Sequence, residues 1–328
     1  MRVFVTGATG FIGSHLVPKL ISRGHSVTGL ARDPKKAEWL AKMGATPAAG
    51  DVTDRESMRE PMRGSDAVFH LAGWYAYGIR DRQRMVAVNV DGARNTLEMA
   101  FEQGIPRIVH TSTVAAFGNT RGRIADESYR AEKREAVSEY ERTKWMAHYE
   151  VAVPLQQRGA PLIIVQPGVV IGPGDPSQIP TYYAIFFRRM PVMFGAKSGV
   201  TWAHVDDIAE GHVLALEKGK PGESYILAGP PLTFRQAMQM WETITGVPAP
   251  RVWLPGWLAG ALSRLAGLME RAAGLRLSFS AEELRTVADY TFFGSADKAK
   301  RELGWQPRPV EETFRETLEE WRKQRRPS

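Results

Sequence analysis

A tyrosine and a lysine four residues apart could carry out acid/base chemistry. Tyr140 and Lys144 lie in a run with helical periodicity, so both side chains face the same way. A phenol has a pKa of about 10 and is a poor acid or base at neutral pH, but a neighbouring ammonium group favours the phenolate. We therefore expect Tyr140 to exchange a proton with a substrate and Lys144 to lower the pKa of Tyr140.

Hydroxyl groups about 30 residues upstream provide a chemical context for this pair. Thr111, Ser112 and Thr113 stand at the end of the strand predicted at 107–111. A hydroxyl at that position could hold a substrate carbonyl or alcohol beside Tyr140. The alternative is that these residues only terminate the strand.

A glycine-rich segment near the N-terminus could bind phosphates. The sequence TGATGFIG, at 6–13, lies between a predicted strand and a predicted helix. Gly7 permits a tight turn, Gly10 lets the backbone approach a pyrophosphate, and Gly13 lets the helix pack against the strand. The free amides at the start of the helix would then face the phosphates. This position predicts a dinucleotide site, in which Lys144 could also hold the nicotinamide ribose. A positively charged nicotinamide would favour the Tyr140 phenolate together with Lys144.

Charged residues after the second predicted strand bear on the choice of dinucleotide. Arg32 could stack on adenine and pair with a 2′-phosphate, and Lys36 lies about one helical turn later. Alternatively, Arg32 is an ordinary loop cation and Asp33 holds the ribose hydroxyls. The sequence favours NADP(H), with NAD(H) as the alternative. Asp51, after the third predicted strand, could accept from the adenine amino group, cap a helix, or do both.

The elements that must position these residues alternate between strand and helix. We predict strands at 2–5, 26–31, 46–49, 67–71, 107–111 and 162–165, and helices at 11–22, 34–43, 82–103 and 136–157. Continuous apolar strands suit a sheet that is covered on both faces, and the repetition indicates parallel strands with right-handed crossovers. Residues 1–166 are therefore predicted to form an α/β domain, a Rossmann doubly wound parallel sheet with helices on both faces.

After Pro167 the pattern changes to turns rich in Pro and Gly, an aromatic run and shorter helices. We expect residues 167–328 to form mainly a smaller C-terminal α/β substrate lobe, with segments around 200–228 returning to the Rossmann domain. Thr233, and Ser280 with Glu283, are predicted to open helices. The apolar helix at 257–271 could touch a membrane, but a lid or subunit-contact helix is favoured.

Composition excludes several classes of protein. The chain has 328 residues, 43 Lys and Arg against 36 Asp and Glu, and no cysteine. A disulfide scaffold, a thiolate metal site and a cysteine nucleophile are therefore excluded, and no metal site is predicted. The formal charge of +7 is scattered, so we expect no nucleic-acid partner. With neither a secretory signal nor a long apolar stretch, we expect no integral membrane segment and a cytoplasmic location.

Taken in chain order, these motifs resemble the extended short-chain dehydrogenase/reductase family, described as NAD-dependent epimerase/dehydratase. Within it the chain is similar to the dihydroflavonol-4-reductase-like and hopanoid-associated sugar epimerase branch. The motifs that carry the resemblance are TGATGFIG, Gly50-Asp51, Phe69-His70-Leu71-Ala72, Asn89-Val90-Asp91-Gly92, 111–118, Tyr140 with Lys144, 166–175, His204-Val205-Asp206-Asp207 and 299–305.

The resemblance implies a role for each matching residue. Thr113 takes the place of the catalytic Ser/Thr, Tyr140 is the acid/base, and Lys144 is its partner. Many relatives are dimers through the helices at 82–103 and 136–157, so a homodimer is expected. Motifs and resemblance together predict these cofactor-binding residues: Gly7, Thr9, Gly10, Phe11, Ile12, Arg32, Lys36, Asp51, Val52, Leu71, Ala72, Gly73, Thr111, Tyr140, Lys144, Pro167, Val169 and Val170.

The predicted function is NAD(P)H-dependent transfer of hydride between nicotinamide and a carbonyl or secondary alcohol. Epimerisation of a nucleotide sugar with tightly bound cofactor is the alternative, and a non-catalytic dinucleotide-binding protein is a third hypothesis. Val114 and Ala115 stand where sugar-nucleotide dehydratases of the family carry an acidic pair, which disfavours lyase chemistry. The lining around 179–194 fits an apolar carbonyl compound, although Arg188 and Arg189 could meet a diphosphate.

Overall fold

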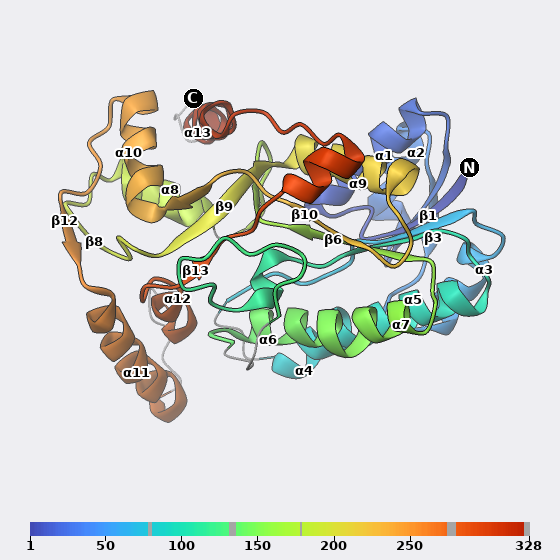
Figure 1. Ribbon diagram of the computed structural model, residues 1–328, viewed down its shortest axis with the longest axis horizontal. Coiled ribbons are helices and arrows are strands. Elements are labelled where there is room, and N and C mark those ends of the chain that lie inside the picture. The colour runs from blue at the N-terminus through green and yellow to red at the C-terminus, as the bar shows by residue number, and fades with distance from the viewer. Residues whose placement is uncertain (78–80, 131–135, 178, 274–279, 325–328) are drawn as a thin grey trace.

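A seven-stranded parallel sheet forms the centre of the molecule in the computed structural model, which describes residues 1–77, 81–130, 136–177, 179–273 and 280–324 (Figure 1). The strand order is β10-β6-β5-β4-β1-β2-β3. The strands are β1 (Arg2–Thr6), β2 (Ser26–Ala31), β3 (Thr46–Ala49), β4 (Ala67–His70), β5 (Ile108–Thr111), β6 (Leu162–Pro167) and β10 (Ser224–Leu227).

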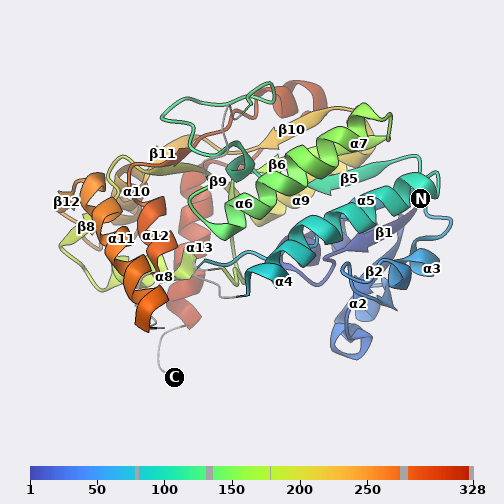
Figure 2. The ribbon, with the colours of Figure 1, turned by 90° about the horizontal axis from the view of Figure 1, so that it is seen from below.

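Helices cover both faces of this sheet, as the apolar strands predict (Figures 1 and 2). One face carries α1 (Phe11–Ser22), α2 (Glu38–Lys42) and α9 (Val205–Lys218). The other carries α3 (Arg59–Met62), α4 (Arg82–Val86), α5 (Gly92–Glu102), α6 (Glu139–Met146) and α7 (Val153–Gln157). The predicted Rossmann doubly wound class is therefore confirmed. A domain boundary at 166/167 stays a prediction, although β10 pairs with β6 and so belongs to the main sheet.

Three of the predicted helices are segmented. The predicted helices at 82–103 and 136–157 contain π-helical stretches, Ala87–Asp91 and Ala147–Ala152, between their α-helical parts. The predicted helix at 34–43 begins as a 3₁₀ turn, Pro34–Ala37, before α2. Periodicity alone does not separate these backbone forms, because the apolar stripe continues through them.

The smaller lobe is built on a second sheet in the order β11-β9-β13, with β7 also paired to β9. The strands of this sheet are β7 (Val169–Ile171), β9 (Gly199–His204), β11 (Pro231–Thr233) and β13 (Thr291–Phe292). In the same lobe, β8 (Val192–Phe194) and β12 (Val252–Leu254) pair as a separate two-stranded sheet. Its helices are α8 (Ile179–Phe187), α10 (Phe234–Thr245), α11 (Gly256–Ala273), α12 (Ala281–Thr286) and α13 (Val310–Gln324). Capping boxes at Thr233 and Ser280 confirm both predicted helix starts.

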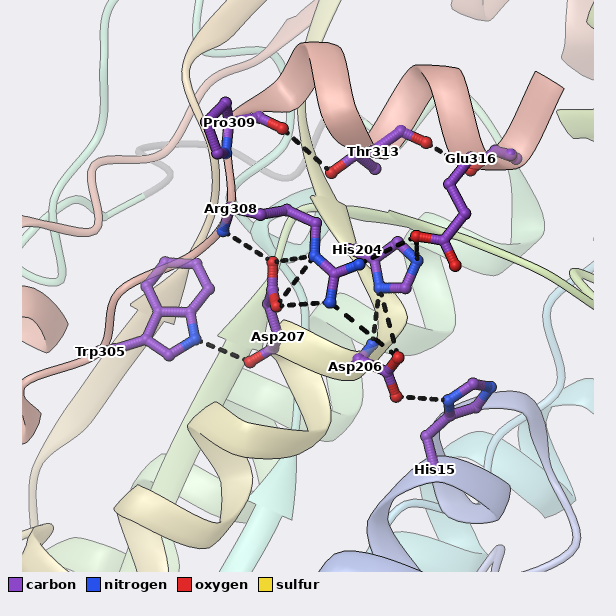
Figure 3. Close-up of polar contacts among 10 residues, drawn as sticks. His15, His204, Asp206, Asp207, Trp305, Arg308, Pro309, Thr313 and Glu316 are labelled. Atoms are coloured by element: carbon purple, nitrogen blue, oxygen red, sulfur yellow. Dashed lines mark hydrogen bonds and ion pairs between the residues drawn. The ribbon is translucent and has the colours of Figure 1, made fainter. Parts of the chain in front are cut away.

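A polar network at the start of α9 joins the glycine-rich helix to the C-terminal segment (Figure 3). His15 of α1 lies 2.7 Å from the Asp206 carboxylate, Nδ1 to Oδ1. Arg308 donates backbone and guanidinium hydrogens to the Asp207 carboxylate over 2.9–3.2 Å. Trp305 Nε1 donates to the Asp207 carbonyl oxygen at 2.7 Å. The motif around Asp206 and Asp207 therefore holds the two lobes together.

Candidate active site

The carboxyl ends of β1, β4, β5 and β6 open on a cavity of about 550 Å³. In a parallel sheet these ends share one edge, where ligands bind. Most of the predicted site residues line this cavity: Gly7, Gly10, Phe11, Ile12, Gly13, Leu71, Gly73, Thr111, Thr113, Tyr140, Lys144, Pro167, Val169 and Val170. Thr9, Arg32, Lys36, Asp51, Val52 and Ala72 lie outside its lining.

The predicted catalytic residues come together from two elements. Ser138 caps α6 by accepting from the Glu141 backbone, and this helix places Tyr140 and Lys144 on the cavity wall. Thr113, two residues after β5 and the N-cap of the 3₁₀ turn Val114–Phe117, lies within hydrogen-bond reach of the Tyr140 hydroxyl. Lys144 Nζ donates to the Thr111 carbonyl oxygen at 2.9 Å. A substrate oxygen could therefore meet two hydroxyl groups above a buried ammonium group.

The residues of the chain by themselves do not lower the pKa of Tyr140 as the sequence predicts. Burial raises this pKa above its usual value, the hydrogen bond with Thr113 lowers it, and nearby Glu141 raises it further. Lys144 is not among the groups that shift this pKa, and its ammonium group donates to the Thr111 carbonyl oxygen. Burial in turn lowers the pKa of Lys144 to about 8. At neutral pH the site therefore presents a neutral phenol, which is the form that donates a proton.

A buried carboxyl group, that of Glu141, follows Tyr140 directly in the sequence. Burial raises the pKa of Glu141 to about 8, although hydrogen bonds from Val137 and Ser138 oppose this shift. The Glu141 carboxyl accepts from the Val137 amide at 3.1 Å and from the Ser138 hydroxyl at 3.2 Å. Near neutral pH Glu141 is therefore largely protonated, which limits the negative charge beside Tyr140.

The glycine-rich turn has the geometry that a dinucleotide requires. Gly7 has φ +71°, and a Cβ there would stand 2.6 Å from the Ala72 nitrogen. A Cβ at Gly13 would collide with the Gly7 carbonyl oxygen. Among the residues that the structure describes, no side chain caps α1, so the amides of its first turn remain available to phosphate oxygens. The chain therefore fits a pyrophosphate at this turn.

In the charged segment after β2, Arg32 and Asp33 have different surroundings. Asp33 accepts from the Lys35 amide at 3.1 Å, and Lys36 Nζ lies 3.8 Å from the Asp33 carboxylate. Arg32 is exposed and has no ion pair within the described ranges of the chain. The Asp33 carboxylate thus stabilises its own turn, whereas the Arg32 guanidinium is free to meet a phosphate.

Asp51 forms a local turn after β3. Its Oδ1 accepts from the backbone and the hydroxyl of Thr53, both at 2.9 Å. It is not the N-cap of the following 3₁₀ turn, since that turn begins at Glu56 and its N-cap is Arg55. The expected helix cap is therefore replaced by a turn, and contact with adenine stays a prediction. Val52 is buried in the core between β2 and α5.

Four buried histidines beneath the cavity are features that sequence reasoning missed. His70 Nδ1 lies 2.8 Å from the Thr6 hydroxyl, and its ring stacks on His110 at 5.3 Å. His148 Nδ1 lies 2.9 Å from the Ser112 hydroxyl. His212 Nε2 lies 2.9 Å from the Thr111 hydroxyl. His70 and His110 both stand at strand ends in the sequence, but only their pairing in register shows that they stack.

Burial keeps all four rings neutral. It lowers the pKa of His70 and of His148 to about 3 and that of His212 to about 4. The pKa of His110 is lowered well below its usual value, again chiefly by burial. The floor of the site therefore carries no histidine charge at neutral pH.

Aromatic side chains from both lobes form much of the remaining wall. The Tyr75 ring meets the Tyr140 ring edge to face, with centroids 4.7 Å apart. In the aromatic run at 182–187, Tyr182 lines the cavity, whereas Tyr183 and Phe186 are buried in the core of the smaller lobe. Together the aromatic lining residues are Phe11, Trp74, Tyr75, Tyr77, Tyr140, Tyr182, Trp202, Phe234, Tyr290 and Phe292. Two short segments, 74–77 and 290–292, supply five of them, but the other five come from distant parts of the chain, so no single spacing signal identifies the set.

Basic side chains are sparse in the cavity wall. Among the described lining residues Lys144 is the one Lys or Arg, whereas Glu141, Asp175 and Glu283 are acidic. Arg188 and Arg189 are exposed and do not line the cavity. The expectation that these arginines could meet a substrate diphosphate is therefore not supported. The described residues also hold no group of three His, Asp or Glu that could bind a metal.

Comparison with known proteins shows the family. Residues 3–228 match the NAD dependent epimerase/dehydratase family. A protein of Synechocystis named "Putative dihydroflavonol 4-reductase" is 33% identical over 92% of this chain and 89% of its own length. A 4-hydroxy-2-methyl-3-oxo-4-farnesyl-3,4-dihydroquinoline-1-oxide ketoreductase of Stigmatella aurantiaca is 31% identical over 93% of this chain and 92% of its own length. The crystal structure of gox2253 has a TM-score of 0.83 and 33% identity, covering 100% of this chain and 99% of that one.

The chain belongs to the NAD-dependent epimerase/dehydratase family, which confirms the resemblance inferred from its motifs. It is thus placed among the nicotinamide-dependent oxidoreductases and epimerases. Within the described residues, no helix is long and apolar enough to cross a membrane.

Proposed function

We propose that the chain is an NADP(H)-dependent oxidoreductase that interconverts an apolar carbonyl compound and the corresponding secondary alcohol. The observation that carries this proposal is the cavity wall, which combines many aromatic rings with a single Lys side chain among its described basic residues. An apolar wall with a few convergent polar groups suits a hydrophobic substrate. A nucleotide sugar would bring a diphosphate, for which Lys144 is the only described cation in the wall.

In this proposal each catalytic residue has a separate role. Thr113 orients the substrate oxygen, and Tyr140, a phenol at neutral pH, donates its proton to that oxygen during reduction. Lys144 would hold the nicotinamide ribose and supply positive charge beside the phenolate that forms. The turn at Gly7, Gly10 and Gly13 would seat the pyrophosphate. Bound nicotinamide would supply or accept the hydride.

The proposal is tested with a panel of apolar ketones, aldehydes, secondary alcohols and nucleotide sugars, each assayed with NADPH and with NADH. We expect NADPH-dependent turnover of apolar carbonyl compounds and none with the nucleotide sugars. Interconversion of nucleotide sugars by protein that retains its cofactor would instead establish the epimerase alternative. Cofactor binding without turnover of any class would support the non-catalytic alternative, and absence of NAD(P)H binding would overturn the proposal.

The preference for NADP(H) is carried by Arg32. We expect Arg32→Ala to raise the KM for NADPH by about tenfold or more, because a charge-assisted hydrogen bond to phosphate contributes about 1.5–3 kcal/mol. The KM for NADH should stay within about twofold. Lys36→Ala is the matched control and should have a smaller effect, since Lys36 already faces Asp33. Equal losses with both cofactors would contradict a contact between Arg32 and the 2′-phosphate.

We also propose a homodimer through the helices that the sequence predicts at 82–103 and 136–157. In the structure the corresponding helices, α4 to α5 and α6 to α7, pack together on one face of the sheet (Figure 2). Trp145 and Tyr149 on this layer are partly exposed, with ring centroids 5.2 Å apart. Large aromatic side chains of this kind are common at subunit contacts.

A further inference from the structure

Helix α11 presents large apolar side chains to solvent. Trp257, Leu265 and Leu268 are 72%, 55% and 59% exposed. With Ala261 and Arg264 they recur at the spacing of a single helical stripe, and both views show α11 at the edge of the molecule beside α12 (Figures 1 and 2). A contiguous exposed apolar face of this kind marks an interaction site more often than a bare surface.

The inward face of α11 carries small residues instead. Ala259, Ser263 and Ala266 are buried where the helix packs against α12. Leu262 and Met269, which flank the outer stripe, are 38% and 37% exposed. The usual arrangement of a surface helix is thus reversed, since its largest apolar groups point away from the protein core.

Charge identifies the partner that suits this face. Arg264 lies near the middle of the stripe, and the described part of the stripe carries no acidic residue. Glu270 is directed inward and accepts from the Ala281 amide at 3.0 Å. A two-fold contact between copies of α11, centred on the stripe, would bring Arg264 against its own copy without a compensating acid. An anionic surface satisfies the apolar groups and the guanidinium together.

We propose that α11 docks the protein on an anionic lipid surface, lying in the plane of the interface with Trp257, Leu265 and Leu268 inserted. A tryptophan at one end of the stripe suits this position, because its ring is apolar and its N–H is polar. The helix behind it, α12, contributes Glu283 and Thr286 to the cavity wall. Docking through α11 would therefore bring the substrate cavity close to the lipid.

Co-sedimentation with vesicles tests this proposal. The full chain is mixed with vesicles of phosphatidylcholine alone or of equimolar phosphatidylcholine and phosphatidylglycerol. We expect binding to the anionic vesicles, at least tenfold weaker binding for Leu265→Glu with Leu268→Glu, and a reduced preference for phosphatidylglycerol in Arg264→Ala. Ile124→Glu, which changes another exposed apolar residue outside α11, is the matched control and should bind like the parent chain.

Two further measurements keep the result interpretable. Thermal unfolding and NADPH binding show whether each variant is folded, independently of lipid and of the substrate class proposed above. Light scattering gives the molar mass. Failure of the parent chain to bind vesicles, or equal binding by the double variant, would overturn lipid docking. A dimeric parent that becomes monomeric in the double variant would assign α11 to a subunit contact instead.

Discussion

Replacing Tyr140 by phenylalanine is expected to lower kcat for carbonyl reduction by about a thousandfold, within the usual contribution of a positioned general acid. The variant keeps the ring that packs edge to face on Tyr75 but loses the hydroxyl that reaches Thr113. Because the phenol rather than the phenolate prevails at neutral pH, the change removes the proton that the substrate oxygen would receive. Steady-state kinetics at saturating NADPH measure this loss.

Two controls separate chemistry from binding in this experiment. The Kd for NADPH should stay within about threefold in Tyr140→Phe, since the phosphate-binding turn is untouched. Tyr75→Phe is the matched variant, because it removes a hydroxyl from the ring that lies 4.7 Å away in the same wall. Retained turnover in Tyr140→Phe, or an equal loss in both variants, would refute the role assigned to Tyr140.

The parts of the site that could be predicted from the sequence are those fixed by local backbone geometry. The turn at Gly7 and Gly13 follows from steric demands within one strand-to-helix connection, and the structure shows the required close approaches. Tyr140 and Lys144 share a wall because one helix carries both at helical spacing. Capping residues such as Thr233 and Ser280 are similarly local, which explains why both helix starts were predicted correctly.

The parts that could not be predicted depend on contacts between distant segments. Phe292 and Trp202 reach the cavity through the pairing of β13 with β9, which no periodicity in the sequence reveals. The position of Lys144 one helical turn away predicts a lower pKa for Tyr140, but the tertiary structure buries the phenol, and burial raises this pKa. The sign of a pKa shift depends on burial, and burial is a property of the whole fold.

The buried histidines lead to the second large expected effect, a steep loss of stability in mild acid. In the unfolded chain each histidine takes up a proton as the pH falls below about 6.5, whereas His70, His148 and His212 in the folded protein stay neutral down to about 3 to 4. The unfolded state then binds more protons than the folded state, so the free energy of unfolding decreases as the pH falls.

The size of this effect follows from the four residues together. Between neutral pH and about pH 5, each histidine that stays neutral in the folded protein lowers the free energy of unfolding by about 2 kcal/mol. The four together lower it by about 8 kcal/mol. Glu141 offsets about 2–3 kcal/mol of this loss, because its carboxyl is protonated in the folded protein but ionised in the unfolded chain over the same range. The remaining loss is still comparable to the whole stability of an ordinary domain, which is about 5–15 kcal/mol. We therefore expect the urea midpoint to fall sharply between about pH 6.5 and about pH 5, and the loss to continue until the folded pKa values are reached.

His110 offers the cleanest test of this explanation. Both of its ring nitrogens are buried without a hydrogen-bond partner among the described residues, so His110→Phe removes a titrating group and breaks no hydrogen bond. The variant should lose about 2 kcal/mol less stability than the parent chain between about pH 7.5 and about pH 5, whatever its absolute stability. The free energy of unfolding of each protein is measured by urea denaturation at both pH values. The packing cost of the larger ring does not depend on pH, so it cancels when the change with pH is compared between the two proteins. An unchanged slope, or a His110 ring that titrates near pH 6.5 by NMR in the folded protein, would show that burial does not hold this histidine neutral.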